Sequence, residues 1–141
     1  MIILDTNVLS ALMSGSPDEA VTLWLNAQPS LSIWTTAITL FEIKLGLAAM
    51  PSGRRRASLE RDFHRCFTDI LEARILDFDP AAAQEAATLE GRRRRDGRTH
   101  ELRDTMIAGI AVAQRATLAT RNTRHFGDLP VPVVNPWADR S

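Results

Sequence analysis

The stretch that most constrains the fold is the opening run Ile2-Ile3-Leu4, which ends at Asp5. Three consecutive aliphatic residues with almost no polar neighbours are typical of a strand buried on both faces inside a parallel sheet. In open α/β sheets, ligands bind beyond the carboxyl ends of the strands. We therefore expect Asp5 to face such a crevice; the alternative is that it only begins a turn or caps the following helix.

Short apolar strands alternate with helical segments along the rest of the chain. This alternation predicts a single three-layer α/β/α domain with a mostly parallel central sheet of four to five strands. We place the domain at residues 1–137 and a C-terminal tail at residues 138–141. The strands are expected at residues 2–4, 31–35, 74–78, 117–120 and 131–134, and the helices at 8–13, 18–28, 37–49, 54–72, 80–95 and 103–113.

Composition points to an ordinary globular domain. The chain has 141 residues, of which 45% are apolar and 24% are charged. No apolar run approaches the roughly 20 residues that a membrane span needs, and no secretory signal precedes Asp5. We therefore expect a cytoplasmic protein without membrane association. The single cysteine, Cys66, has no internal partner and is expected to be a small buried hydrophobic residue.

The formal net charge is zero, but the basic residues are unevenly distributed. All of the 17 basic residues are arginines except Lys44, and they cluster at Arg54–Arg56 and at Arg92–Arg95 with Arg98. Arginine is well suited to bidentate contact with phosphate. The pattern fits either local basic patches around an acidic site or simply solvated helix surfaces.

A second carboxylate, Glu42, lies in the helix expected at residues 37–49. We predict that Ile38, Phe41, Leu45 and Ala48 form the core-facing stripe of that helix and that Glu42 lies within it. A carboxylate in such a stripe is unfavourable unless it is paired or binds a cation. The alternative is a glutamate at the edge of the stripe whose carboxylate reaches solvent.

A third carboxylate, Asp104, lies in the first turn of a helix that is apolar on every face and must therefore be buried. The alternative role for Asp104 is a favourable acid at a helix N-terminus. Beyond the strand expected at residues 117–120, Thr120 and Asn122 offer polar oxygens, or else ordinary turn chemistry.

Three carboxylates in one pocket repel each other unless a divalent cation neutralises them. Oxygen ligands select hard cations, so Mg²⁺, with Mn²⁺ as a possible substitute, is expected as the cofactor. The histidines His64, His100 and His125 do not have ligand spacing, and Cys66 has no partner, so a zinc site is not expected.

Four segments resemble the PIN domain in sequence, order and spacing: Ile3–Asn7, Ala37–Gly46, Asp104–Ala108 and Ala119–Thr123. The resemblance covers residues 1–137. It is closest to the VapC toxins of bacterial toxin–antitoxin pairs, and the ending Val134–Trp137 is similar to the FitB-like branch.

The resemblance implies that Asp5, Glu42 and Asp104 are the catalytic, metal-binding carboxylates. A fourth family position, acidic in some members, matches Asn122, and a neighbouring position that is often aspartate matches His125. The number of metal ions, one or two, is therefore left open. A secondary polar shell is expected from Thr6, Asn7, Thr120 and Asn122.

The implied function is that of a metal-dependent endoribonuclease toxin, which hydrolyses RNA phosphodiester bonds and is inhibited by a cognate antitoxin. Family members typically form homodimers, and contact with DNA is expected only through the antitoxin. The side chains expected to guide the RNA backbone are Arg92, Arg93, Arg98, Arg121 and Arg124. For residues 92–95, a solvated helix end near its favourable dipole is the alternative.

Two other functions fit parts of the same pattern. A haloacid-dehalogenase-type phosphatase or a receiver domain also places an aspartate at a strand end, but the phosphatase needs a second aspartate where Asn7 stands. Both also use a lysine near the phosphoryl group, and Lys44 is turned away from Glu42. The other alternative is a catalytically weak PIN scaffold that acts as a binding partner in an antitoxin–DNA autoregulatory complex.

Overall fold

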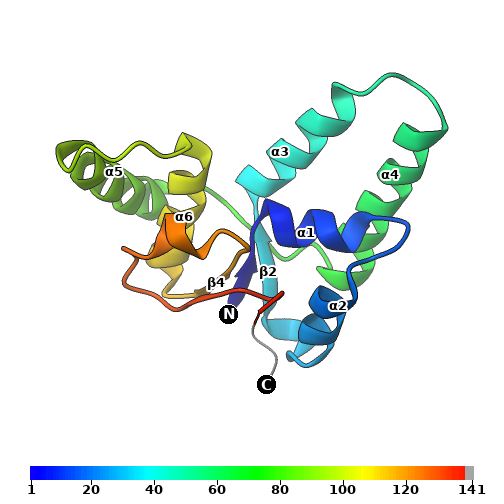
Figure 1. The fold of residues 1–141 in the computed structure, drawn as a ribbon, viewed down its shortest axis with the longest axis horizontal. Helices are drawn as coiled ribbons and strands as arrows, with labels where there is room; N and C mark the ends of the chain where they lie inside the picture. Colours follow the sequence, from blue (N-terminus) through cyan, green and yellow to red (C-terminus); the bar gives the residue numbers. More distant parts are fainter. Residues whose placement is uncertain (139–141) are drawn as a thin grey trace.

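The computed structural model of the chain describes residues 1–138 and shows a parallel sheet between two groups of helices (Figure 1). In the sheet order β3-β2-β1-β4-β5, every pairing is parallel. The predicted α/β/α class with a parallel sheet is confirmed, and the strand that leads to Asp5 is central. The strands are β1 (Ile2–Leu4), β2 (Ile33–Thr36), β3 (Ile75–Leu76), β4 (Thr117–Ala119) and β5 (Val133–Val134).

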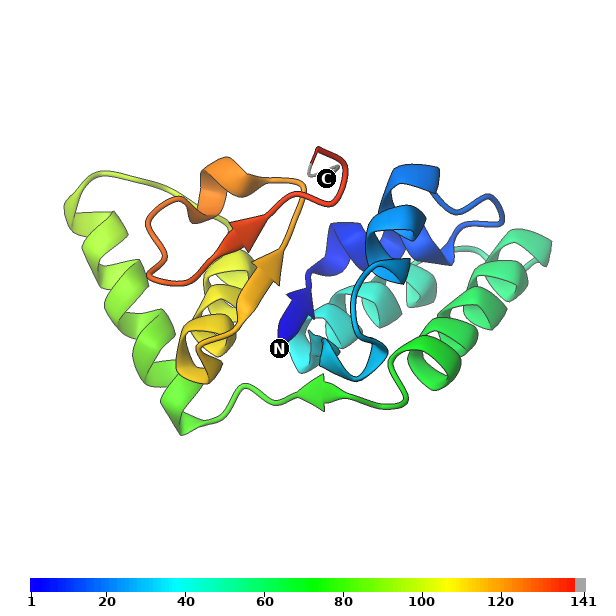
Figure 2. The ribbon, with the colours of Figure 1, turned by 90° about the horizontal axis from the view of Figure 1, so that it is seen from below.

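The helices form two groups. Figure 2 shows α1 to α4 on one side of the sheet and α5 with α6 on the other. Short turns of 3₁₀ or π helix occur at Ser30–Ser32, Cys66–Ile70 and Thr123–Phe126. The α-helices of the described residues are α1 (Thr6–Met13), α2 (Glu19–Asn26), α3 (Ala37–Ala48), α4 (Arg54–Arg65), α5 (Pro80–Arg95) and α6 (Leu102–Gln114).

The strands supply two cores because successive side chains of a strand point to opposite faces of the sheet. Leu4 and Ile33 pack into the core formed with α1, α2 and the turn after α4. Ile3 and Leu118 pack into the core formed with α5 and α6. β1 is thus buried on both faces, as its continuous apolar sequence predicts.

Helices α5 and α6 approach each other closely at Gly109. A Cβ atom at this position would lie 2.6 Å from the carbonyl oxygen of Ala82 and 2.7 Å from the Cβ of Ala86. Any larger residue would therefore push the two helices apart. Since α6 carries Asp104 in its first turn, this contact fixes where that carboxylate lies relative to the sheet.

Side-chain caps start two helices directly at the carboxyl edge of the sheet. Asp5 Oδ1 accepts a hydrogen bond from the Val8 N–H at 3.1 Å, and Thr36 Oγ1 accepts one from the Thr39 N–H at 3.1 Å. Both residues follow or end a strand, so strand and helix join without an intervening loop. The first turns of α1 and α3 therefore lie together at this edge.

Several predicted strands and helices are longer than those in the structure. The strand expected at residues 74–78 pairs only at Ile75–Leu76, and the strand expected at 131–134 only at Val133–Val134. Regular helix after Arg54 ends at Arg65, and the chain then leaves the π-helical turn through Glu72 and Ala73, both with positive φ. Two consecutive left-handed residues cannot continue a right-handed helix.

Three smaller expectations have clear outcomes. Cys66 is fully buried, as expected, and it is a free cysteine. Of the predicted tail at residues 138–141, residues 139–141 lie outside the described part of the chain. No helix within residues 1–138 has the length and apolar content that crossing a membrane requires.

Candidate functional site

Asp5 stands at the carboxyl end of the central strand. Its backbone N–H continues the ladder to the carbonyl of Ala119 at 3.1 Å, and its side chain is only 6% exposed. The carboxylate accepts hydrogen bonds from the Val8 N–H and from the Thr120 hydroxyl. Asp5 therefore caps α1, as the alternative interpretation held, while its carboxylate also lies among the other polar groups of this edge.

Glu42 is held by α1. The Thr6 hydroxyl donates to Glu42 Oε1 at 2.8 Å and lies 3.2 Å from the hydroxyl of Thr39. The Glu42 side chain is 19% exposed, with its other oxygen, Oε2, 3.9 Å from Arg103 Nη1. This glutamate thus bridges α3 to α1 and faces the start of α6.

The stripe predicted for α3 is wrong. Phe41 and Leu45 are exposed, whereas Thr39 and Ile43 are buried. α3 carries apolar residues on most sides, so helical spacing alone could not identify its inward face. Glu42 is next to the buried row rather than inside it.

Asp104 lies in the first turn of α6, across the carboxyl edge from α3, as the arrangement of these helices in Figure 1 shows. Its side chain is 30% exposed, and its Oδ2 lies 3.8 Å from Nδ1 of His125, which belongs to the turn Thr123–Phe126. Its sequence neighbour Arg103 faces both Glu42 and Glu101. The two residues thus bring one carboxylate and one guanidinium to the same edge.

The charges of Asp5 and Asp104 influence each other. Burial raises the pKa of Asp5 to about 6, and the negative charge of Asp104 adds to the rise, while hydrogen bonds from Thr120 and Val8 oppose it. Burial also raises the pKa of Asp104, and the neighbouring His125 lowers it. Two desolvated carboxylates of this kind ionise together at neutral pH most readily when a cation neutralises them.

The donor chemistry fits a hard divalent cation, since the groups at this edge are carboxylate and hydroxyl oxygens. Within residues 1–138, however, no three histidine, cysteine, aspartate or glutamate side chains are grouped so that they could hold a metal ion between them. The carboxylates that influence each other are Asp5 and Asp104, and Glu42 is engaged by Thr6. Two carboxylates completed by water are a usual arrangement for Mg²⁺.

The four residues predicted to form a secondary polar shell differ in what they contact. Thr6 and Thr120 touch Glu42 and Asp5 through their hydroxyl groups. Asn7 and Asn122 have exposed side chains, and their backbone N–H groups interact with Asp5 and with Thr120 Oγ1, respectively. Among the hydrogen bonds of residues 1–138, none joins either asparagine side chain to a carboxylate of the site.

The prediction that Arg93 guides the RNA backbone is wrong, because its side chain is 1% exposed. Its guanidinium donates to both carboxylate oxygens of Asp128, at 2.9 and 2.8 Å, to the Thr105 hydroxyl at 3.0 Å and to the His125 carbonyl at 2.7 Å. The hydrogen bonds from Arg93 hold the pKa of Asp128 down, at about 2. Arg93 therefore helps to fix the positions of Asp104 and His125, because it donates hydrogen bonds to Thr105, the residue after Asp104, and to the backbone carbonyl of His125.

The other arginines of that prediction lie on the surface. Arg92 and Arg124 are exposed, and Arg98 lies 3.4 Å from Asp128 Oδ2. Arg121 stacks on the ring of Trp137, with 4.8 Å between its guanidinium carbon and the ring centre. A basic residue that the sequence interpretation missed is Arg103, and its position next to Asp104 in the sequence was the available signal.

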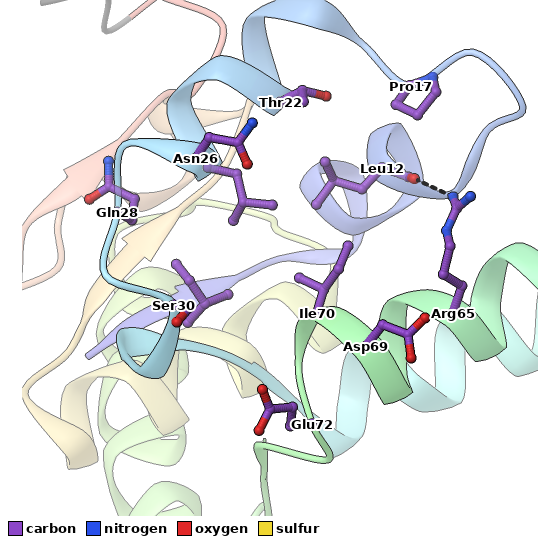
Figure 3. Close-up of a pocket in the computed structure, with 12 residues that line it drawn as sticks. Leu12, Pro17, Thr22, Asn26, Gln28, Ser30, Arg65, Asp69, Ile70 and Glu72 are labelled. Carbon is purple, nitrogen blue, oxygen red and sulfur yellow. Dashed lines mark hydrogen bonds between the residues drawn. The ribbon is translucent and has the colours of Figure 1, made fainter.

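A separate pocket, of about 390 Å³, lies at the opposite edge of the sheet (Figure 3). Its lining includes Ile33, where β2 begins, whereas Asp5 follows the end of β1. Figure 3 shows Leu12 and Ile70 facing this hollow, with Arg65 at its rim donating to the Leu12 carbonyl at 3.4 Å. None of the predicted site residues lines it, so it is distinct from the carboxylate edge.

Comparisons with known proteins agree with the geometry. The family model described as PIN domain matches residues 2–131. The chain is 38% identical to the VapC ribonuclease Y4jK of Sinorhizobium fredii, over 97% of this chain and 98% of the relative. It is 33% identical to the toxin FitB of Neisseria gonorrhoeae, over 99% and 100%. A solved structure of FitAB bound to an IR36 DNA fragment superposes with a TM-score of 0.87 at 32% identity, covering 100% of this chain and 99% of the other.

Proposed function

Because the chain belongs to the PIN domain family, we propose that it is a metal-dependent endoribonuclease toxin of a toxin–antitoxin system. The observation that carries the proposal is the pair of desolvated carboxylates, Asp5 and Asp104, at the carboxyl edge of the sheet. Relatives at 33% and 38% identity over nearly the whole chain are a toxin and a ribonuclease.

Asp5 and Asp104 would hold the metal ion, for which Mg²⁺ fits best and Mn²⁺ is a substitute. When bound, such an ion lowers the pKa of a water molecule and stabilises negative charge on phosphate oxygens. Glu42 would lie outside the ion's direct ligands and would accept a hydrogen bond from a water molecule. Thr6 fixes its carboxylate for this role through the 2.8 Å hydrogen bond.

The remaining groups position the reacting partners. The Thr120 hydroxyl and the Val8 N–H direct their hydrogen bonds at Asp5 and favour its ionised form. Arg103 lies 3.9 Å from Glu42 Oε2, which supports a role for its guanidinium in binding a phosphate of the RNA. The buried Arg93 hydrogen-bonds both the first turn of α6 and the turn at His125, and so fixes their positions relative to each other.

The proposed partners are a cognate antitoxin, through which the complex binds DNA, and a second copy of the chain. A DNA-bound FitAB structure shares this fold at 32% identity, which supports the first partner. Exposed Phe41 and Leu45 on α3 and Leu102 at the start of α6 supply an apolar surface for the second. Large exposed apolar side chains that gather on packed helices are typical of association surfaces.

Cleavage of total RNA by the purified protein tests the proposed function. We expect discrete products with Mg²⁺ or Mn²⁺, none with a chelator, and none from Asp5→Asn at equal concentration. Asparagine keeps the cap on α1, so the variant should remain folded by circular dichroism. Equal cleavage by Asp5→Asn would overturn the site. A wild-type protein free of antitoxin that cleaves nothing would favour a PIN scaffold that only binds partners.

A further inference from the structure

A groove of about 320 Å³ opens directly from the carboxylate edge between α1, α3 and α4. Thr6 and Glu42, the hydrogen-bonded pair of the site, line one end of it. Met50 and Leu59 line the other end. Between these ends the wall consists of Ser10, Met13, Ile43, Gly46 and Leu47.

The lining is suited to a flat, largely apolar ring. Met13 and Ile43 are buried and contribute apolar side chains, and methionine adapts to the faces of aromatic rings. Gly46 leaves open space on the α3 wall, since a Cβ atom built there would meet no atom within 4 Å. Between its two ends, the wall carries the hydroxyl group of the exposed residue Ser10. Ligand sites of this kind combine apolar walls with a few placed polar groups.

The far end of the groove is basic. A second hollow shares Met50 with the groove and continues along Pro51–Gly53 to Arg54, Arg55 and Arg56. Arg56 is paired with Glu60 at 2.7 Å. Arg54 and Arg55 are exposed, and neither has a carboxylate within salt-bridge distance among residues 1–138. From Glu42 to Ala48, where α3 ends, the helix advances by about 9 Å, at roughly 1.5 Å per residue.

We propose that this groove binds a single-stranded nucleotide of the RNA substrate next to the cleaved bond. The base lies between α1 and α3 against Gly46, and the backbone continues toward Arg54 and Arg55. The inference rests on the proposed function and adds to it the path of the substrate and the residues that determine which base is accepted.

Charge favours RNA over a protein segment as the occupant. The carboxylate end takes a phosphate through a cation, and the arginine end takes a phosphate directly, so both ends suit a polyanion. The apolar stretch between them suits a base, and single strands expose bases for such contacts. A segment of a protein partner in the groove is the competing occupant, and the experiment below separates the two.

The decisive variant is Gly46→Phe, because a Cβ atom at position 46 meets no atom within 4 Å and the added ring would occupy the groove. Replacing a glycine inside a helix removes a conformational penalty, so the variant should be at least as stable as the wild type. The matched control is Gly91→Phe on α5, where a Cβ atom would meet only Arg95 Nη1, at 4.0 Å. Two readouts are needed: kcat/KM for RNA cleavage with Mg²⁺, and anisotropy of a labelled single-stranded RNA without divalent ions.

We expect Gly46→Phe to lower kcat/KM at least tenfold, to weaken RNA binding, and to change which sites in total RNA are cut. Gly91→Phe should match the wild type in RNA cleavage, in RNA binding and in the sites that are cut. Cleavage and RNA binding unchanged by Gly46→Phe, beside an active wild type, would overturn the groove and leave the proposed function intact. Unchanged RNA binding with lost antitoxin binding would assign the groove to the protein partner. A wild type that neither cleaves nor binds RNA would overturn both.

The arginine end has its own test. The double variant Arg54→Gln/Arg55→Gln should reduce the slope of log affinity against log salt by about 1.4, at roughly 0.7 per phosphate contact in a single strand. The control Arg61→Gln/Arg115→Gln removes two exposed charges from other parts of the surface and should leave the slope unchanged. Equal slopes in the two double variants would remove Arg54 and Arg55 from the path.

Discussion

The two flanks of the carboxylate edge are held in place by different forces. On the flank formed by β1, α1 and α3, Asp5 and Glu42 are fixed by hydroxyl groups and a helix cap: Thr120 and the Val8 N–H for Asp5, and Thr6 for Glu42. This flank opens into the groove along α3. At the far end of this groove, the side chains of Arg54 and Arg55 are exposed.

On the flank formed by α5, α6 and the turn at His125, the support is a buried ion pair. Arg93 makes four hydrogen bonds to Asp128, Thr105 and the His125 carbonyl beneath Asp104. Buried charges that are fully paired resist displacement, because each unpaired alternative leaves a desolvated charge. The contrast indicates a rigid flank that places Asp104 and a more adaptable flank that receives substrate.

The largest effect should follow from breaking the rigid flank. Arg93→Met removes the buried guanidinium with its four hydrogen bonds and leaves the half-buried Asp128 with only the 3.4 Å contact to Arg98. Removing one partner of a fully buried pair costs about 3–5 kcal/mol of unfolding free energy, which is the upper bound here. Urea unfolding measures this free energy. Arg93→Lys keeps the charge but loses the planar, two-pronged hydrogen-bonding geometry of the guanidinium, so its unfolding free energy should lie between those of the wild type and Arg93→Met. The neighbouring Arg92→Met, at an exposed position, is the control and should stay within about 0.5 kcal/mol. A loss below about 1 kcal/mol for Arg93→Met would contradict the contrast between the flanks.

A second effect concerns pH on the adaptable flank of the metal-free protein. The pKa of Asp5 rises from 3.8 to about 6 on folding, so burial disfavours its charged form. Below about pH 4 Asp5 is protonated in both the folded and the unfolded protein and does not lower the unfolding free energy. As pH rises through about 6, the folded protein must ionise a buried carboxyl group, and this stability is lost. Asp5→Asn removes this dependence and should stabilise the metal-free protein at pH 8 by up to about 3 kcal/mol, at about 1.4 kcal/mol per pKa unit.

Thermal unfolding of the wild type and Asp5→Asn in chelator, at pH 4.5 and at pH 8, checks the sign. The variant should gain more stability relative to the wild type at pH 8 than at pH 4.5. A variant that is less stable than the wild type at pH 8 would show that Asp5 is not held in a desolvated position.

The smallest effect should come from the hydroxyl group that orients Glu42. Thr6→Val keeps the side-chain shape but removes the 2.8 Å hydrogen bond, and we expect kcat to fall about tenfold, or about 1.4 kcal/mol. Thr6→Ser restores the hydroxyl and should recover most of the rate. If valine and serine reduce kcat equally, the hydroxyl group has no positioning role.

Much of the carboxylate edge was accessible from sequence. The buried strand Ile2–Leu4 and the fully apolar helix after Asp104 are strong signals, because each leaves few ways to bury its residues. They place Asp5 and Asp104 at strand and helix ends. Glu42 was singled out by its place in the apolar stripe predicted for its helix, but Phe41 and Leu45 of that stripe are exposed. The resemblance to the PIN domain was therefore the sounder reason to select Glu42.

The role of Arg93 was harder to predict, since four consecutive arginines suggest a solvated helix end. Yet Ala82, Ala86 and Leu89 are the buried residues that precede it on α5, and their spacing of four and three residues places position 93 on the same face. What the sequence does not reveal is Asp128, 35 residues later, whose carboxylate makes burial of the charge possible. Such a long-range partner can only be identified in three dimensions.

The most direct test of the proposed metal pair is calorimetric titration of Mg²⁺ or Mn²⁺ into the wild type, Asp5→Asn and Asp104→Asn, in two buffers of different ionisation enthalpy. An ion held by a carboxylate with a pKa near 6 displaces its proton, so binding at pH 6 should release protons and binding at pH 8 should release fewer. Both variants should lose binding while remaining folded. Wild-type affinity in Asp5→Asn, with no proton release at pH 6, would contradict a metal site built on Asp5 and Asp104.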